Sequence, residues 1–448
     1  MIESLFILLA SGISFLYGEP DGFLILLSAL ISFVFGGLIW FLTRNAKKTL
    51  GKREGYIIVT MVWIVFSLFG SLPFVITGSI TSYTDAFFET MSGFTTTGAS
   101  VLNNIESLSH GILFWRSISQ WMGGMGIIVL SLAILPILGI GGMQLFSAEV
   151  PGVTPDKFHP RVKETAKRLW GIYIIYTVAE AILLSLGGMT VFDAVCHAFT
   201  TMATGGYSTK QLSIAHYESP FIHYVIIVFM FLAGTNFSLS YFAMKGKFKK
   251  VWNNEEFRFY GFLVITFSLL ITGVLMYHHY DVFEKSFRDS LFQVVSIMTT
   301  TGYVTADYLL WVPFLVVLIL FIMFFGGSAG STGGSVKIVR ILVLFKNSYY
   351  ELKRLIHPKA IIPVRLNKMT VSEQIISNVL AFIVFYIMIF VFATIVMSAL
   401  GLEIDSAMGS VAATLGNIGP GIGSVGPMFN YAHISDFGKW FISFLMLL

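Results

Sequence analysis

The sequence predicts an all-α polytopic membrane protein. In this fold four units, each made of a transmembrane helix, a short pore helix and a second transmembrane helix, surround a central pore and follow an N-terminal transmembrane hairpin. Three observations support it: the chain is 56% hydrophobic and only 12% charged, long apolar segments recur along it, and one short polar segment occurs four times in the same register. A composition this apolar excludes an ordinary soluble protein.

The apolar segments define the expected helices. Except for the first and the last, each is long enough to cross a hydrocarbon core, which needs roughly 20 helical residues. The first run has no basic leader and no clear small-residue cleavage site, so residues 1–50 are expected to form a retained two-helix hairpin. The expected segments are 2–17, 23–43, 55–78, 111–139, 169–188, 220–244, 259–277, 311–345, 374–400 and 437–448.

The basic residues predict the orientation. Of the 28 Lys and Arg residues, 21 lie in four segments, Arg44–Glu54, Gly141–Arg168, Lys245–Arg258 and Lys346–Thr370. By the positive-inside rule these segments and the N-terminus are cytoplasmic. The opposite face is left with an excess of acidic residues and is expected to attract cations, although insertion rules alone also explain the imbalance. The basic residues are not interleaved with aromatic ones on a soluble face, which argues against nucleic acid as a partner.

Four polar segments carry the strongest internal signal. Each ends on a glycine that follows its first residue by thirteen positions, and the shared register indicates four homologous units around an axis. The segments are DAFFETMSGFTTTG (85–98), DAVCHAFTTMATGG (193–206), DSLFQVVSIMTTTG (289–302) and SAMGSVAATLGNIG (406–419). The expected units are 51–145, 146–250, 251–350, whose second helix is broken, and 351–448, which is expected to be truncated in its last helix.

Each polar segment predicts a half-crossing helix followed by an extended loop. The apolar part is too short to span a bilayer, and the Thr/Gly-rich part is a poor helix former. Bare backbone at membrane depth survives only where protein or water covers it, so four such loops are expected to line a central passage. Asp85, Asp193 and Asp289 are expected to be N-caps of the short helices.

The loop composition points to a cation filter. Backbone carbonyls can replace the hydration shell of a small cation without a fixed negative charge that would trap it, and glycine tolerates the backbone angles that turn them inward. The alternative is that these are polar turns of a receptor or an enzyme. The residues expected to share one layer are Thr96, Thr204, Thr300 and Asn417. The expected filter residues are Thr96, Thr97, Gly98, Thr204, Gly205, Gly206, Thr300, Thr301, Gly302, Asn417, Ile418 and Gly419.

A second polar stretch interrupts the apolar segment 311–345. These 35 residues would measure about 52 Å as one helix, against a core of roughly 30 Å. We expect a break in the third unit only, just cytoplasmic of the filter, which acts either as a gate or as a passive kink. The residues of the break are Gly326, Gly327, Ser328, Ala329, Gly330, Ser331, Thr332, Gly333, Gly334 and Ser335.

The chain resembles the Trk/Ktr/HKT superfamily of cation-translocating subunits over essentially its whole length. The resemblance rests on the motifs SGFTTTGAS (92–100), FWRSISQWMGGMGI (114–127), MATGGYST (202–209), MTTTGYVT (298–305) and GNIGPGIG (416–423). Glycine at all four filter positions implies potassium permeation, and the Gly-rich loop implies a gate. Relatives carry a pore-facing arginine in the last helix, and its equivalent is expected beyond Leu448.

The resemblance also implies partners and a location. It predicts a membrane homodimer in the bacterial cytoplasmic membrane, regulated by a cytosolic TrkA-type ring that binds adenine nucleotides or NAD. The basic segments Gly141–Arg168 and Lys346–Thr370 are large enough to dock it, or else they only contact anionic lipid. The transported potassium ion is the expected ligand, and no organic cofactor is expected in this chain.

Other signals carry less weight. An enzyme is not expected, because acids, bases and metal ligands do not cluster, and GIGSVG (421–426) and GSTGGSVK (330–337) lack the context of nucleotide sites. An alternating-access transporter coupled to sodium or protons is the alternative function, although its repeats are usually inverted. Arg116 is expected to bond carbonyls near the filter, and Glu180 to be paired, protonated or part of a coupling element.

Overall fold

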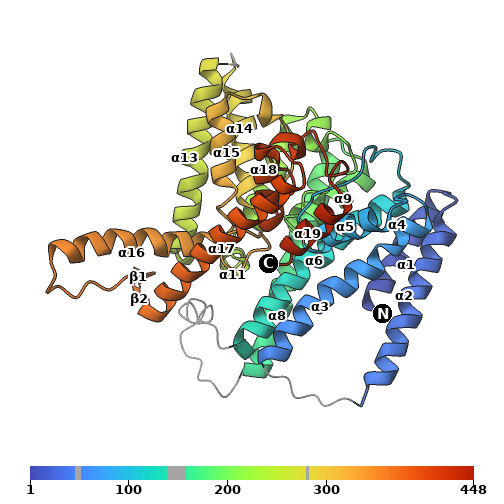
Figure 1. Ribbon diagram of the computed structural model, residues 1–448, viewed down its shortest axis with the longest axis horizontal. Helices are drawn as coiled ribbons and strands as arrows, with labels where there is room; N and C mark the ends of the chain where they lie inside the picture. The colour runs from blue at the N-terminus through green and yellow to red at the C-terminus, as the bar shows by residue number, and fades with distance from the viewer. Residues whose placement is uncertain (46–51, 139–157, 279–281) are drawn as a thin grey trace.

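The computed structural model describes residues 1–45, 52–138, 158–278 and 282–448. Helices dominate these ranges, which confirms the all-α class (Figure 1). The first helices are α1 (Ile2–Leu16), α2 (Gly22–Thr43), α3 (Lys52–Gly70), α4 (Leu72–Ile76), α5 (Tyr83–Phe94), α6 (His110–Leu138), α8 (Phe158–Leu186) and α9 (Val191–Met202). There follow α10 (Pro220–Ala233), α11 (Phe237–Met244), α12 (Phe248–Trp252), α13 (Glu255–His278), α14 (Phe283–Met298), α15 (Pro313–Ile322), α16 (Ile338–Ile356), α17 (Glu373–Ala399), α18 (Ile404–Leu415) and α19 (Asp436–Leu445).

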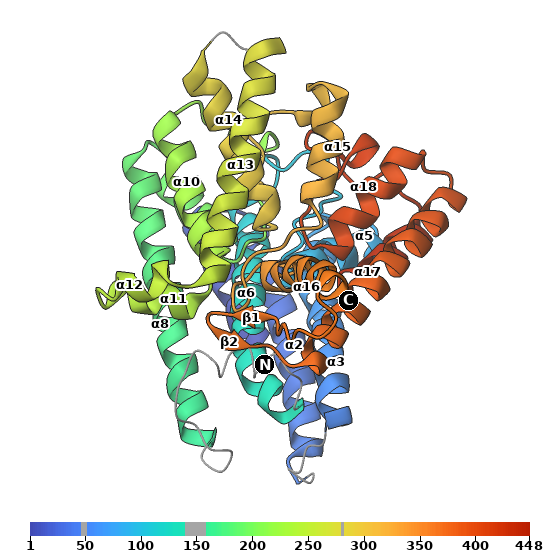
Figure 2. The ribbon, with the colours of Figure 1, turned by 90° about the vertical axis from the view of Figure 1, so that its left-hand side faces the viewer.

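Four short helices follow the expected pattern. The helices α5, α9, α14 and α18 contain 12, 12, 16 and 12 residues, which makes them roughly 18 to 24 Å long and too short to cross a bilayer. Each packs between the longer helices before and after it, and α1 and α2 pack beside the first of these groups. In Figure 2 the helices α8 and α10, then α13 and α14, then α17 and α18 follow one another across the molecule, from green through yellow to red.

Several helices are long and apolar enough to cross a membrane. Among the described residues four qualify singly, Gly22–Thr43, Thr165–Leu186, Glu255–His278 and Glu373–Ala399. The side chains of Phe385, Met388 and Phe392 on α17 are 63%, 61% and 64% exposed, as expected for a surface that faces lipid tails. The exact unit boundaries stay a prediction, and those near residues 50 and 145 lie outside the described residues, as does most of Gly141–Arg168.

One expected straight helix is bent. The segment 220–244 consists of α10 and α11, which meet at 110° across the break Gly234–Asn236. Asn236 caps α11 by accepting a 2.8 Å hydrogen bond from the Ser238 amide. The expectation that only the third unit has a broken second helix is therefore wrong. A Gly-Thr-Asn sequence combines a weak helix former with a strong N-cap, and this combination ends one helix and starts another.

The expected acidic N-caps are also wrong. The caps of α5 and α9 are Ser82 and Thr190, whose hydroxyls accept hydrogen bonds from the amides of Asp85 and Asp193 at 3.4 and 3.1 Å. Asp289 lies in the second turn of α14, which begins at Phe283. A hydroxyl residue three positions before an acid is the stronger start signal, because its oxygen reaches the third amide of the helix.

A small separate core lies where α16 meets α17. Between these helices the chain forms an antiparallel hairpin, β1 (Arg365–Leu366) paired with β2 (Met369–Thr370). Figure 1 shows α16 extending away from the body, crosswise to α13. The buried residues of this core, which we call the α16–hairpin core, are Val339, Leu342, Val364, Leu366, Val371, Ile375 and Val379. The core therefore ties the segment after the broken helix to the hairpin and to α17.

Candidate functional site

The four loops that follow the short helices share one backbone conformation. The residues Thr96, Thr204, Thr300 and Asn417 have left-handed φ angles of 56°, 53°, 60° and 53°, although none of them is glycine. Two positions later come Gly98, Gly206, Gly302 and Gly419, with φ angles of 80°, 74°, 79° and 98°. Non-glycine residues rarely adopt this conformation. Its recurrence in four loops matches the register seen in the sequence.

The loops also contact one another in cyclic order. A Cβ atom added to each glycine would meet a carbonyl oxygen of another loop: Gly98 meets Gly205 at 2.1 Å, Gly206 meets Thr301 at 1.9 Å, Gly302 meets Ile418 at 1.9 Å, and Gly419 meets Thr97 at 2.8 Å. Each loop therefore places a carbonyl against the glycine of a neighbour, and the fourth loop returns to the first. We call these four loops the filter ring, after the role predicted for them from the sequence. Two features require glycine at these four positions: the positive φ angle, and the neighbouring backbone, which leaves no room for a Cβ atom.

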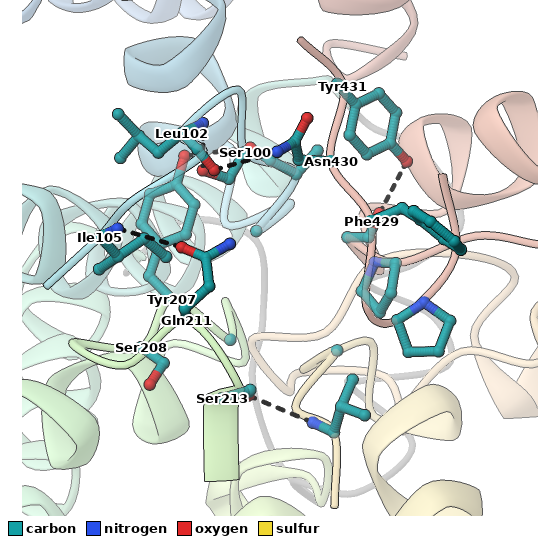
Figure 3. Close-up of a pocket in the computed structure, with 18 of the residues that line it drawn as sticks. Ser100, Leu102, Ile105, Tyr207, Ser208, Gln211, Ser213, Phe429, Asn430 and Tyr431 are labelled. Carbon is teal, nitrogen blue, oxygen red and sulfur yellow. Dashed lines mark hydrogen bonds between the residues drawn. The ribbon is translucent and has the colours of Figure 1, made fainter. Parts of the chain in front are cut away.

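A recess on one side of the filter ring receives residues from all four loops. Gly98, Gly206, Gly302 and Gly419 line it together with the side chains shown in Figure 3. The described residues that line it include no carboxylate, and its two cationic side chains, Arg116 and Lys210, each pair with an acid. A cation in this recess would therefore meet carbonyl and hydroxyl oxygens and not a ring of fixed negative charge.

A buried ion pair holds the first two loops. Arg116 Nε lies 2.7 Å from Glu89 Oε1, with side-chain exposures of 3% and 0%. Arg116 also donates to the Ser208 carbonyl at 2.8 Å and covers the Tyr207 ring at 3.7 Å. Glu89 accepts from the Val101 amide at 2.9 Å. Arg116 thus bonds a carbonyl next to the filter, as expected, while Glu89 was missed because it lies inside a short helix that reads as apolar packing.

Further side chains bind the ring from behind. Gln120 donates to the Gly205 carbonyl at 2.7 Å and accepts from the Tyr207 amide at 3.0 Å. The Tyr431 hydroxyl donates to the Gly419 carbonyl at 2.7 Å. These residues were not identified from the sequence. The one available signal was a glutamine within an otherwise buried helix. The carbonyl oxygen and the NH2 group of a buried glutamine side chain both need hydrogen-bond partners.

The first and fourth loops are joined directly. The Thr97 hydroxyl donates to Asn417 Oδ1 at 2.6 Å, and the Tyr431 amide donates to the carbonyl of Ser100 at 2.9 Å. Behind them, Lys439 Nζ lies 2.5 Å from Asp85 Oδ1. These contacts close the ring between residues that are more than 300 positions apart in the sequence, without a covalent link.

The segment Gly326–Ser335 lies against the other side of the filter ring, away from the recess. The Gly334 amide donates to Thr300 Oγ1 at 2.7 Å, and Thr204 Oγ1 donates to Thr332 Oγ1 at 3.2 Å. A Cβ atom on Gly333 would lie 2.7 Å from the Thr299 carbonyl oxygen. This polar segment therefore contacts the filter ring directly.

The same segment fills the bend between α10 and α11. The Ser328 amide donates to the Gly234 carbonyl at 2.8 Å, and the Phe237 amide donates to the Gly330 carbonyl at 3.2 Å. Two broken helices thus satisfy each other's free backbone groups, which is the condition for irregular backbone at membrane depth. Lys337 Nζ, at the end of the segment, donates to the Gly333 carbonyl.

Glu180 and Cys196 lie apart from these contacts. Glu180 is fully buried in α8 and has no ion pair with any described residue, so a protonated carboxyl or a coupling role stays a prediction. Cys196 is a buried free thiol, consistent with packing. Within the described residues no group of three or more His, Cys, Asp or Glu side chains is placed to hold a metal ion.

Comparison with known proteins decides the family. The profile of TrkH, described as cation transport protein, matches residues 22–448. This chain belongs to the TrkH family. It is 42% identical to the Trk system potassium uptake protein TrkH of Salmonella typhimurium, over 100% of this chain and 94% of that protein. It is 35% identical to TrkG of Escherichia coli, over 90% of this chain and 84% of that protein.

A solved structure of the TrkH family has the same fold. The crystal structure of the potassium transporter TrkH from Vibrio parahaemolyticus superimposes with a TM-score of 0.90 at 39% identity, covering 99% of this chain and 92% of that one. The chain is therefore a multi-pass membrane protein of a cation transport family, as expected from its sequence.

Proposed function

We propose that this chain takes up potassium across the bacterial cytoplasmic membrane, with its basic segments and N-terminus on the cytoplasmic side. The similar proteins from Salmonella and Vibrio are named for potassium uptake and transport. The observation that carries the proposal is the closed filter ring. Each of its four glycines lies against a carbonyl oxygen of the next loop. In this proposal backbone oxygens of the ring are the ligands, which suits an ion that must shed water quickly and leave again.

The filter assignment is tested with Gly98→Ser. A side chain at this position would meet the Gly205 carbonyl at 2.1 Å, so the ring must deform or accept a hydroxyl as a ligand. We expect the ratio of potassium to sodium flux in proteoliposomes to fall, and a serine placed at the exposed Asn103 to leave it unchanged. An unaltered ratio in Gly98→Ser would contradict the assignment.

The segment Gly326–Ser335 is proposed to be the gate. Its contacts with Thr204 and Thr300 of the filter ring, and the basic segment Lys346–Thr370 that follows it in the chain, support a position between the ring and the basic side of the protein. Most of these contacts are single hydrogen bonds to small polar groups, which exchange readily for water. Deleting Ala329–Ser331 should raise potassium flux and make it less dependent on a regulator. Unchanged flux and regulation in a folded variant would leave the segment as a kink.

A cytosolic partner is proposed to regulate this gate, on a membrane homodimer. The expected partner is a TrkA-type ring that binds adenine nucleotides or NAD, and the segment Lys346–Thr370 offers six basic residues for it on the proposed cytoplasmic side. Affinity purification at native expression, followed by flux measurements with added nucleotide, tests this. A dimer that purifies without any regulatory ring and conducts independently of nucleotide would contradict the proposal.

A further inference from the structure

We propose that Glu256 is the positioning residue that holds the Gly326–Ser335 segment closed, and that Glu255 links this hold to α16 and the β1–β2 hairpin. The inference rests on the proposed gate and adds to it the route by which the cytoplasmic surface acts on the segment. In this inference the route passes through Glu255 and Glu256, two consecutive acidic residues in the first turn of α13.

Glu256 contacts the segment directly. Its Oε1 atom accepts a hydrogen bond of 2.7 Å from the Ala329 amide, and its side chain is 5% exposed. A hydrogen bond to a charged acceptor is roughly twice as strong as one between neutral groups. Ala329 lies in the middle of the segment, so this bond fixes the part that is farthest from both helix ends.

Glu255, the neighbour of Glu256, points to a different partner. Its carboxylate pairs with Lys346 on α16, and the same Lys346 ammonium donates to the Arg365 carbonyl of the hairpin at 2.8 Å. The Glu255 amide donates to Asn367 Oδ1 at the hairpin turn at 2.8 Å. A displacement of α16 or of the hairpin is therefore transmitted to the first turn of α13, which also carries Glu256.

A second contact connects the same places. The Ala329 side chain packs against the α16–hairpin core, as does Phe259 of α13. Other contacts of the segment go to the filter ring and to the bend at Gly234, and its Gly327 carbonyl accepts a hydrogen bond of 3.2 Å from the Ile338 amide at the start of α16. Ala329 is thus the residue of the segment that meets both Glu256, by its amide, and the α16–hairpin core, by its methyl group.

The test compares three variants of the full chain in proteoliposomes, without the regulatory partner. Glu256→Ala leaves the Ala329 amide without its acceptor in the closed state, and we expect open probability to rise about tenfold. Glu256→Gln keeps an acceptor but loses the charge, so its rise should be smaller. The matched control is Glu373→Ala, which removes an exposed acid from the first turn of α17 on the same side and should change nothing.

Two readouts separate positioning from damage to the fold. The ratio of potassium to sodium flux should stay at the wild-type value in all three variants, because the filter ring is untouched. A gain in open probability cannot come from misfolding, since an unfolded chain conducts no ions. With the partner present, Glu255→Ala should reduce the response to nucleotide, because it cuts the link to Lys346.

The outcomes also distinguish this inference from the proposed gate. If deletion of Ala329–Ser331 raises flux while Glu256→Ala does not, the gate stands and the role of Glu256 is wrong. If neither variant raises flux, both are wrong. A rise in Glu256→Ala that equals the rise in the Glu373→Ala control would likewise contradict the inference, because it would show no dependence on the contact with Ala329.

Discussion

The filter ring and the Gly326–Ser335 segment have nearly the same composition but are held in different ways. Both consist of Gly, Ser, Thr and a few other small residues. The ring takes its loops from four separate helices and is fixed by buried charged and amide groups such as Arg116, Glu89 and Gln120. The segment is one connection between α15 and α16, held by single hydrogen bonds to hydroxyls and carbonyls and by one bond to the Glu256 carboxylate. The filter ring and the segment therefore differ in the side chains that hold them and not in the residue types of which they consist.

The largest effect is expected from adding one methyl group to the ring. In Gly206→Ala the new Cβ atom would lie 1.9 Å from the Thr301 carbonyl oxygen, which no real structure tolerates, so the neighbouring loop must move. Potassium uptake should fall at least about tenfold, since even a shift of a filter carbonyl of a few tenths of an ångström weakens ion coordination. Uptake is measured in a strain that lacks other potassium transporters.

The control for that change is Gly78→Ala. Gly78 has the same φ of 74° as Gly206, but nothing lies within 4 Å of its added Cβ atom. It therefore shares the backbone strain and lacks the collision. Equal losses in the two variants would show that strain, and not the closeness of the next loop, requires glycine in the ring.

The next effect concerns the ion pair behind the ring. Glu89→Gln leaves the Arg116 guanidinium buried without its counter-charge, which should lower the free energy of unfolding by about 3–5 kcal/mol. Thermal denaturation in detergent measures it. The exposed pair Arg354–Glu351 serves as the control, because Glu351→Gln should cost less than about 1 kcal/mol. Similar costs at both sites would show that the ring is no more firmly held than the surface.

A smaller change in potassium flux is expected when a substitution pushes the segment Gly326–Ser335 away from the filter ring. In Gly333→Ala the new Cβ atom would lie 2.7 Å from the Thr299 carbonyl oxygen, and because the segment yields more easily than the ring, the segment should shift. Potassium flux should rise by about threefold to fivefold, equivalent to the loss of roughly one hydrogen bond, at an unchanged ratio of potassium to sodium. Gly171→Ala, which meets nothing within 4 Å, is the control. A fall in selectivity would mean that the ring had moved instead.

The smallest effect is expected from one hydroxyl group. Tyr431→Phe removes the 2.7 Å hydrogen bond to the Gly419 carbonyl, a loss of about 1 kcal/mol. The ratio of potassium to sodium flux should fall by about twofold to fivefold, and Tyr277→Phe, at a side chain that is 84% exposed, should leave it unchanged. A fully wild-type ratio in Tyr431→Phe would show that this carbonyl is fixed by the backbone alone.

The common register of the four loops could be predicted because it depends only on residues close together in the sequence. A repeated interval of thirteen residues and a glycine at its end are properties of each loop by itself, and so is the left-handed conformation at Asn417, which replaces threonine in the fourth loop. The contact of Arg116 with a carbonyl could also be expected, since a buried guanidinium needs acceptors.

What escaped prediction depends on pairing between distant segments. Glu89 and Arg116 are 27 positions apart in the sequence. The Tyr431 hydroxyl donates to the carbonyl of Gly419, in an earlier part of the same unit. Sequence spacing alone reveals neither pair. The bend at Gly234–Asn236 was missed for a different reason. Its three residues lie within an apolar run of the length of one span, and the gain from filling the bend with Ser328 appears only when two units meet.

A Cβ atom added to Gly419 of the fourth loop would lie 2.8 Å from the first-loop carbonyl oxygen, against 1.9 to 2.1 Å for the corresponding atoms at the other three glycines. The fourth loop is also where asparagine replaces threonine and proline follows the glycine. Because one polypeptide encodes all four quarters, a mutation alters one of them and leaves three intact, which a tetramer of identical subunits does not permit. Gene duplication followed by separate change in each copy could therefore tune this pore one quarter at a time.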